Sequence, residues 1–402
     1  MHVPNDSTYL YRDKGYWKAI QQDYIEAIAM ERLAVDSEVR AGRCSEVRKI
    51  VQLKCLIPLE RKLNELNGYV NLRNGMLSLR TREIHPHSKD HFSTIQLPVT
   101  YNEKAICPRW RQFLEEVFEG DKERIGLVQE FMGYSMVPDT RYEKALLMLG
   151  QGANGKSTLI RVWEHIIGKE NYSSVALGNL QNEFHRVKLY KKLLNIAAEV
   201  RDTTLEQADY FKRIVTGDTI DAAHKFKDVF EFRPFARLVF AMNKIPRVKD
   251  TSHAFYRRLL IVPFNRVFKP LEQDKELQKK LLAEADGVFQ WALWGLDRLY
   301  MNNAFTEPKI VREELAAYQR ANNPVVAFVE DSCNLDTEFS TSKSILYDEY
   351  KKYCEEYGFK AGSVSTFFKE LYTAYPSLVS ARPRTDQGRE QVVEGIVVVK
   401  KI

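Results

Sequence analysis

Short apolar runs separated by helical stretches mark the middle of this 402-residue chain. The runs are Ala145–Leu149, Leu193–Ala198, Arg237–Met242 and Leu259–Val262. Runs of this length and texture are typical of strands buried on both faces of a mostly parallel sheet, and their alternation with helical segments predicts an α/β domain. The first three runs lead into Gly150, Glu199 and Asn243. The pattern therefore predicts polar chemistry at the carboxyl edge of the sheet, where open α/β sheets bind ligands.

The amino-terminal part has another pattern. From Tyr11 to about Leu66 the apolar residues follow a helical period, which predicts a small helical layer. The apolar positions are Trp17, Ile20, Tyr24, Ile25 and Ile28. Alternation around Asn74-Gly75, within residues 69–79, predicts a short β element. It is followed by extended chain to residue 98 and by two amphipathic helices, over residues 110–119 and 122–134.

After Asn303 the pattern is helical again, over residues 312–320 and 325–331. The tail from Ser342 predicts a helix, a turn at 358–362, a second helix over 363–375, and two extended segments, 378–384 and 392–400, which flank a turn. Helix, turn, helix and β-hairpin in this order are typical of a winged helix. We therefore expect three domains, over residues 1–105, 106–300 and 301–402.

Composition narrows the class of protein. With 44% hydrophobic and 28% charged residues, the chain has material for two or three domains with cores. The five cysteines form no Cys-x-x-Cys pair, so neither a disulfide framework nor a zinc site is indicated. No membrane span or signal-peptide pattern is visible, so we expect a cytoplasmic protein without a membrane partner. The net charge of +6 is compatible with a polyanionic partner but does not require one.

The strongest motif is the sequence Gly-Gln-Gly-Ala-Asn-Gly-Lys-Ser-Thr at residues 150–158. It lies between a predicted strand and a predicted helix, which is the context of a Walker A loop. Its glycines let backbone N–H groups surround phosphates, Lys156 neutralises their charge, and the hydroxyl of Ser157 is placed to bind Mg²⁺. The expected nucleotide-binding residues are Gly150, Gly152, Asn154, Gly155, Lys156, Ser157 and Thr158.

Two further polar residues follow strands of the same sheet. Glu199 ends the run 193–198 in the manner of a Walker B acid, able to hold Mg²⁺ or to polarise the attacking water. A second carboxylate is missing because Ala198 precedes it, so the sequence leaves the division of these two roles open. Asn243 can orient that water or sense the γ-phosphate. The alternatives are an ordinary exposed Glu after a strand and a turn-forming Asn.

Arg257 and Arg258 come just before the last strand, at the amino edge of the sheet and away from their own Walker A loop. An arginine in this position suits the γ-phosphate site of a neighbouring subunit, which requires a closed head-to-tail ring. A surface charge pair is the alternative. The sequence does not choose between the two arginines.

Basic residues between Glu199 and Asn243 are candidates for contact with a nucleic-acid strand. The aromatic Phe226 lies among them, and ammonium groups with a ring suit phosphates and bases, although charge runs are often only solvated. The winged-helix tail adds further candidates, with protein docking as the alternative. The candidate DNA-binding residues are Lys212, His224, Lys225 and Lys227 before Asn243, and Lys369, Arg382, Arg384 and Arg389 in the tail.

Together these motifs resemble the superfamily 3 helicases, and more narrowly the phage and plasmid primase-helicases related to the poxvirus primase-helicase. Upstream segments resemble that family's amino-terminal region. They are residues 71–75 (Asn-Leu-Arg-Asn-Gly), 85–88 (His-Pro-His-Ser), Leu97-Pro98, Tyr101 and Cys107-Pro108. The resemblance covers residues 65–265 best, and the first sixty residues least.

The resemblance implies an α/β fold with an AAA+ P-loop core, an amino-terminal mainly helical domain and a carboxyl-terminal winged helix. It also implies a hexameric ring around DNA, dependence on ATP and Mg²⁺, and 3′-to-5′ movement on one strand. In this family the loop before Asn243 projects into the pore, which points to His224, Lys225 and Lys227. Asn243 takes the sensor role and Arg257 or Arg258 the finger role. Family members often carry a primase domain, so a primase or polymerase domain or partner is expected.

Three interpretations follow from the sequence. The first is an ATP-dependent DNA helicase that acts on single-stranded and forked DNA as a homo-oligomeric ring. The second is a replication initiator that binds DNA under nucleotide control and does not separate strands. The third is a P-loop kinase, which is disfavoured because no acceptor-site pattern is visible and a winged helix would have no role.

Overall fold

A parallel sheet of five strands forms the centre of the computed structural model. The structure describes residues 1–4, 6–12, 15–34, 40–58, 61–66, 68–198, 208–248, 250, 252–385, 388–389 and 391–399. The strands lie in the order β12-β6-β11-β8-β7. Their bounds are β6 Ala145–Leu149, β7 Tyr172–Ser173, β8 Leu194–Ala198, β11 Arg237–Met242 and β12 Leu259–Pro263. The predicted α/β class and its four apolar strands are confirmed, and β7 is an addition at the edge.

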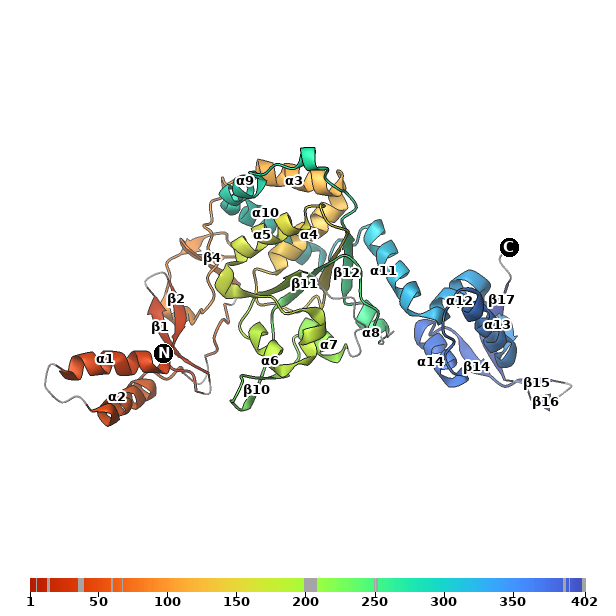
Figure 1. Ribbon diagram of the computed structural model, residues 1–402, viewed down its shortest axis with the longest axis horizontal. Helices are drawn as coiled ribbons and strands as arrows, with labels where there is room; N and C mark the ends of the chain where they lie inside the picture. Colours follow the sequence, from red (N-terminus) through yellow and green to blue (C-terminus); the bar gives the residue numbers. More distant parts are fainter. Residues whose placement is uncertain are drawn as a thin grey trace.

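Both faces of this sheet are buried, because alternate residues of each strand enter two different hydrophobic clusters. In β6, Leu146 and Met148 pack on one side, and Ala145 and Leu147 on the other. Residues of α3 Pro108–Phe118, α4 Lys122–Tyr134, α5 Lys156–Ile167, α9 Leu277–Ala283 and α10 Ala285–Asn302 belong to the first cluster. Residues of α7 Asp209–Thr216, α8 His253–Tyr256 and α11 Lys309–Asn322 belong to the second. The short helix α6 Glu183–Arg186 lies on the same side of the sheet as α7 (Figure 1).

The amino-terminal segment is less helical than the sequence pattern predicts. Helices α1 Gln22–Ala34 and α2 Ala41–Lys54 are present, but β1 Thr8–Arg12 and β2 Tyr16–Ile20 form an antiparallel hairpin. The prediction of a helix through Trp17 and Ile20 is therefore wrong. The physical reason is the pairing of Tyr11 with Trp17 across the hairpin, where the rings meet edge to face at 5.2 Å.

The segment that follows contains the predicted β element. Strands β3 Tyr69–Leu72 and β4 Gly75–Ser78 pair around Asn74-Gly75, and β5 Ile84–His85 adds to β4. Val70, Leu72, Ile95 and Leu97 belong to the same hydrophobic cluster as α3, α4 and α10. This segment thus packs against the central region, and the expected boundary at residue 105 stays a prediction.

A second hairpin projects from the central region on the side of α6 and α7 (Figure 1). It consists of β9 Ile220–Ala223 and β10 Val229–Phe232, paired antiparallel. The rings of Phe230 and Phe232 pack against Tyr190 at 5.4 and 5.1 Å. Lys191, next in the chain, bonds Asp6 and the hydroxyl of Tyr9. The base of the hairpin and the amino-terminal segment therefore meet at residues 190–191.

The carboxyl-terminal part has its own hydrophobic core, which extends from Val325 to Ile396. Its helices are α12 Pro324–Ser332, α13 Lys343–Glu356 and α14 Val364–Ala374, reached through α11 Lys309–Asn322, and its strands are β13 Cys333–Ser342, β14 Val379–Ala381, β15 Arg384–Thr385, β16 Gly388–Arg389 and β17 Val392–Val398. The predicted order of two helices and a hairpin is present, and β13, which the sequence did not indicate, completes a sheet of order β13-β17-β14. The assignment as a winged helix stays a prediction. Among the described residues, no helix combines the length and apolarity needed to cross a bilayer.

Candidate nucleotide-binding site

The Walker A loop lies between β6 and α5, as predicted, and is fixed to its surroundings by backbone hydrogen bonds. The N–H of Gly150 donates to the carbonyl of Met242 at 3.1 Å, and the N–H of Phe268 donates to the carbonyl of Ala153 at 2.7 Å. Gly155 has φ +85°, and a Cβ at this position would lie 2.6 Å from a methyl group of Val117. Only glycine therefore fits where the loop turns into α5.

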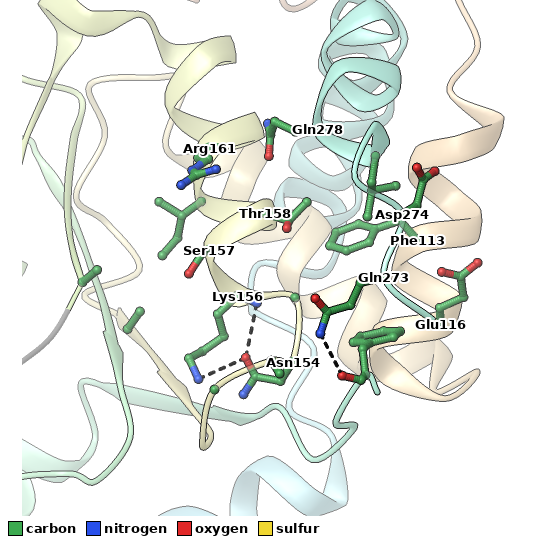
Figure 2. A pocket seen from close by; sticks show the side chains of 18 of the residues that line it. Phe113, Glu116, Asn154, Lys156, Ser157, Thr158, Arg161, Gln273, Asp274 and Gln278 are labelled. Carbon is green, nitrogen blue, oxygen red and sulfur yellow. Dashed lines mark hydrogen bonds between the residues drawn. The ribbon is translucent and has the colours of Figure 1, made fainter. Parts of the chain in front are cut away.

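Lys156 is folded back onto its own loop, with 7% of its surface exposed. Its Nζ donates to the carbonyl of Gly150 and, at 3.2 Å, to Oδ1 of Asn154 (Figure 2). The Nδ2 of Asn154 donates in turn to the carbonyl of Phe264 at 3.3 Å. Burial lowers the pKa of Lys156 from its ordinary value. The ammonium group thus stands at the centre of the loop, where neutral oxygens are its hydrogen-bond partners.

A cavity of about 880 Å³ opens over this loop. One wall consists of the loop itself, the start of α5, Ala198 and the end of β11. The opposite wall comes from α3, from the segment that leads into α9 and from the first residues of α9, and Figure 2 shows α3 and this segment facing the loop. The residues of the second wall are Arg109, Phe113, Glu116, Phe268, Glu272, Gln273, Asp274, Lys275, Leu277 and Gln278.

The structure brings most of the predicted nucleotide-binding residues to this cavity. Gly152, Asn154, Gly155, Lys156, Ser157 and Thr158 line it, whereas Gly150 contributes the carbonyl that holds Lys156. Ser157 lines the cavity and is exposed to it. Its hydroxyl group offers an oxygen ligand, the type of ligand that Mg²⁺ prefers. Asn243 lines the cavity directly after β11. Glu199 lies outside the described residues, and its predecessor Ala198 lines the cavity.

The two arginines before β12 do not line the cavity, as their place at the amino edge of the sheet predicts. Arg257 has half of its side chain exposed and pairs with Glu143 at 2.9 Å. Arg258 is 7% exposed, bonds the carbonyl of Ala254 and lies 3.5 Å from the same carboxylate. Burial, followed by the charge of Arg257, lowers the pKa of Arg258. Arg257 is therefore exposed enough to contact another molecule, whereas Arg258 is held by contacts within its own chain.

The candidate DNA-binding residues fall into separate places. His224, Lys225 and Lys227 are exposed at the tip of the β9–β10 hairpin. Lys212 is in α7 and pairs with Asp250 at 2.7 Å and Asp209 at 3.0 Å, which raise its pKa against the effect of burial. In the tail, Lys369 on α14 and Arg382 are exposed. The side chains of Arg384 and Arg389 lie outside the described set.

Sequence reasoning missed the second wall of the cavity entirely. Its residues belong to amphipathic α3, to residues 268–275 and to the start of α9, and none of these segments carries a motif. Amphipathic periodicity identifies the buried face of a helix, but not the residues of that helix that border a cavity. We find no local signal in the sequence that would have singled out Arg109, Glu116 or Gln278.

Comparisons with protein families match three separate parts of the chain. A model described as D5 N terminal like matches residues 1–119, and a model described as Poxvirus D5 protein-like matches residues 320–388. Between them, a family of unknown function (DUF5906) matches residues 148–258, which include the Walker A loop and the β9–β10 hairpin. Two models named for the same viral protein thus match the two ends of the chain.

Individual relatives are distant in sequence. Proteins L207/L206 of Acanthamoeba polyphaga mimivirus and 184R of Invertebrate iridescent virus 6, both named as candidate helicases, are 21% and 23% identical over 67% and 63% of this chain. The matched region is 31% and 27% of their own lengths, so the chain spans about a third or less of these relatives.

Two solved structures of the NrS-1 C terminal region share the fold. Their TM-scores are 0.59 and 0.54 at 14% identity, and they cover 98% and 96% of this chain and 95% and 92% of their own. The shared fold extends over the amino-terminal, central and carboxyl-terminal parts alike. Together with the matches to the D5 models at both ends and to the viral relatives, this makes the chain similar to the primase-helicase family related to the poxvirus D5 protein.

Proposed function

We propose that this chain is an ATP-dependent DNA helicase of superfamily 3, with an AAA+ core that works as a homo-oligomeric ring in viral, phage or plasmid DNA replication. The observation that carries the proposal is Lys156, buried at the floor of a cavity of about 880 Å³ that the Walker A loop and the carboxyl ends of β8 and β11 enclose. Such a cavity is large enough for a nucleoside triphosphate. The D5-type family and the names of the viral relatives support the helicase class.

In this proposal the backbone N–H groups of residues 152–157 and the ammonium of Lys156 bind the phosphates of ATP. Ser157 and Glu199 would hold Mg²⁺, and the ion would supply positive charge that neutralises the phosphates. Asn243 orients the attacking water, and Glu199 acts on the same water. The donor set fits a magnesium nucleotide, since Mg²⁺ keeps several waters and needs few protein ligands beside the phosphates.

Movement along DNA is assigned to the exposed hairpin tip. His224, Lys225 and Lys227 meet the strand in the pore of the ring, and an arginine before β12 completes the γ-phosphate site of the neighbouring subunit. We further propose that the carboxyl-terminal winged helix contacts template DNA through Lys369 and Arg382, and that a primase or polymerase domain or partner works with the motor.

The test is ATP hydrolysis by the purified chain with Mg²⁺, with and without single-stranded DNA. Turnover should rise with DNA, and Lys156→Ala should abolish it while DNA binding persists. Lys104→Ala, an exposed position away from the cavity, is the control. Hydrolysis by Lys156→Ala at the wild-type rate would refute the assignment of the site.

A forked duplex with one labelled strand separates the helicase from the alternative initiator. Strand displacement that requires ATP and Mg²⁺ supports the motor. Nucleotide-dependent DNA binding without displacement would replace it by the initiator.

A further inference from the structure

Phe268 is an aromatic residue of the cavity that keeps accessible surface. It follows β12, lines the cavity and is only partly buried. The second aromatic residue among the described lining residues is Phe113, which is 1% exposed, so its ring is already covered by protein. Phe268 therefore offers an apolar surface that a ligand can contact without displacing other side chains.

One face of the Phe268 ring is covered by Arg266. The central carbon of the Arg266 guanidinium lies 5.2 Å from the ring centroid, and the same guanidinium pairs with Glu272 at 2.9 Å. A cation over an aromatic face is attracted to it, which favours one orientation of the ring. Because Arg266 does not line the cavity although Phe268 does, Arg266 supports the ring from the side that faces away from the cavity.

The position of Phe268 relative to the Walker A loop limits which part of a nucleotide it can meet. Its backbone N–H donates to the carbonyl of Ala153 in the loop at 2.7 Å, so the ring is held beside the loop. Figure 2 shows Lys156 on one side of the start of α5 and Phe113 on the other. Phosphates bound at Lys156 leave the nucleoside to extend toward the second wall, to which Phe268 belongs.

We propose that Phe268 binds the base of the nucleotide by stacking, and that it favours purine over pyrimidine nucleoside triphosphates. Every base has a π-face, so a stacking platform does not select one base by hydrogen bonds. The two fused rings of a purine remove more apolar surface from water on a phenyl ring than a single pyrimidine ring does. The inference rests on the proposed function, because it requires a nucleotide held at Lys156.

Binding measured by calorimetry without DNA tests this inference, with ATP, CTP and inorganic tripolyphosphate as probes in the presence of Mg²⁺. The wild-type chain should bind ATP more tightly than CTP, and equal affinities would overturn the proposal. Phe268→Leu keeps an apolar side chain but removes the aromatic face. It should weaken ATP binding by about tenfold, bring the ratio of ATP to CTP affinity close to one and leave tripolyphosphate binding unchanged.

Two further variants serve as controls. Phe268→Tyr keeps the ring and should retain the wild-type ratio of ATP to CTP affinity. Val267→Ala changes the preceding residue, which is 59% exposed and outside the cavity, and should leave all three affinities unchanged. If Phe268→Leu weakens tripolyphosphate binding as much as ATP binding, the side chain acts on the Walker A loop and not on the base, and the proposal is overturned.

The outcomes separate the two levels of inference. If the wild-type chain binds neither ATP nor tripolyphosphate, or if Lys156→Ala binds both as well as the wild type does, the proposed function fails and this inference with it. If binding depends on Lys156 but Phe268→Leu keeps the wild-type affinity for ATP, only the role of Phe268 is refuted.

Discussion

The hydroxyl of Tyr318 donates a hydrogen bond to the carbonyl of Pro246 at 2.8 Å. Tyr318 belongs to α11, the helix that leads to the carboxyl-terminal part, and Pro246 lies in the segment that follows Asn243. The ring of Tyr318 also meets the ring of Tyr256 at 5.9 Å, one residue before Arg257. A single side chain thus touches the segments that carry two of the proposed catalytic residues.

Tyr318→Phe should therefore destabilise the fold by about 1–3 kcal/mol, because it leaves the buried carbonyl of Pro246 unpaired. Chemical denaturation measures this loss. Tyr256→Phe is the matched control, since the hydroxyl of Tyr256 is buried without a partner and its removal should cost nothing. Equal losses in the two variants would contradict the role of the hydrogen bond.

The exposed and buried arginines should give opposite results. Arg257→Ala breaks only a surface ion pair, so stability should change by less than about 1 kcal/mol. If Arg257 acts on the ATP of a neighbour, turnover should fall on the order of 10³-fold. Arg258→Ala removes a buried group with several contacts and should lower the thermal midpoint.

Mixing inactive variants tests the action in trans. Lys156→Ala subunits keep Arg257, and Arg257→Ala subunits keep an intact ATP site, so mixed rings should regain part of the hydrolysis. No recovery on mixing, with ring formation verified, would exclude Arg257 as a trans-acting group.

As the pH rises, nucleotide affinity should begin to decline at a lower pH than it would if Lys156 had the ordinary pKa of a lysine. Burial lowers the pKa of Lys156 in the free protein, and bound phosphates raise it, so binding is coupled to proton uptake between the two pKa values. Below this window Lys156 is charged in both states and the affinity is independent of its titration. Calorimetry in buffers of different ionisation enthalpy detects the proton.

Lys156→Arg is the control for this pH effect. Arginine stays charged throughout, so whatever affinity remains in this variant should lack the alkaline decline. A decline of the same size in Lys156→Arg would assign it to another group.

The hairpin tip should contribute a measurable part of the salt dependence of single-stranded DNA binding. Each phosphate contact adds about 0.7 to the slope of log affinity against log salt concentration. The double variant Lys225→Ala/Lys227→Ala should therefore reduce the slope by about 1.4. The control variant Lys104→Ala, at an exposed position, should leave the slope unchanged. An unchanged slope in the double variant would contradict a contact between the hairpin tip and DNA.

The sequence predicted the parts of this molecule that are encoded locally. The central strands are mostly apolar, and the Walker A loop needs glycine and lysine at fixed places, so both are visible without tertiary information. Strand β13 could not be predicted in this way. Most of its residues are polar and exposed, and it is a strand because Cys333 and its successors pair with β17, fifty or more residues away.

The same limit applies to the site. Lys156, Ser157 and Asn243 follow strands of one parallel sheet, so topology alone brings them together. Arg109 and Gln278 reach the cavity through the packing of α3 and α9 beside α5, which depends on contacts between residues more than a hundred positions apart. Glu199 lies outside the described residues, so its predicted role stays a prediction.

The contact of the β9–β10 hairpin with Tyr190 has a mechanical consequence. Phe230 and Phe232 hold the base of the hairpin against Tyr190, and Lys191 bonds Asp6 and Tyr9 of the amino-terminal segment. A swing of the tip about this base must either separate the rings or pull residues 6–9 along. Force applied at the tip would then be transmitted to β1 as well as to the central five-stranded sheet.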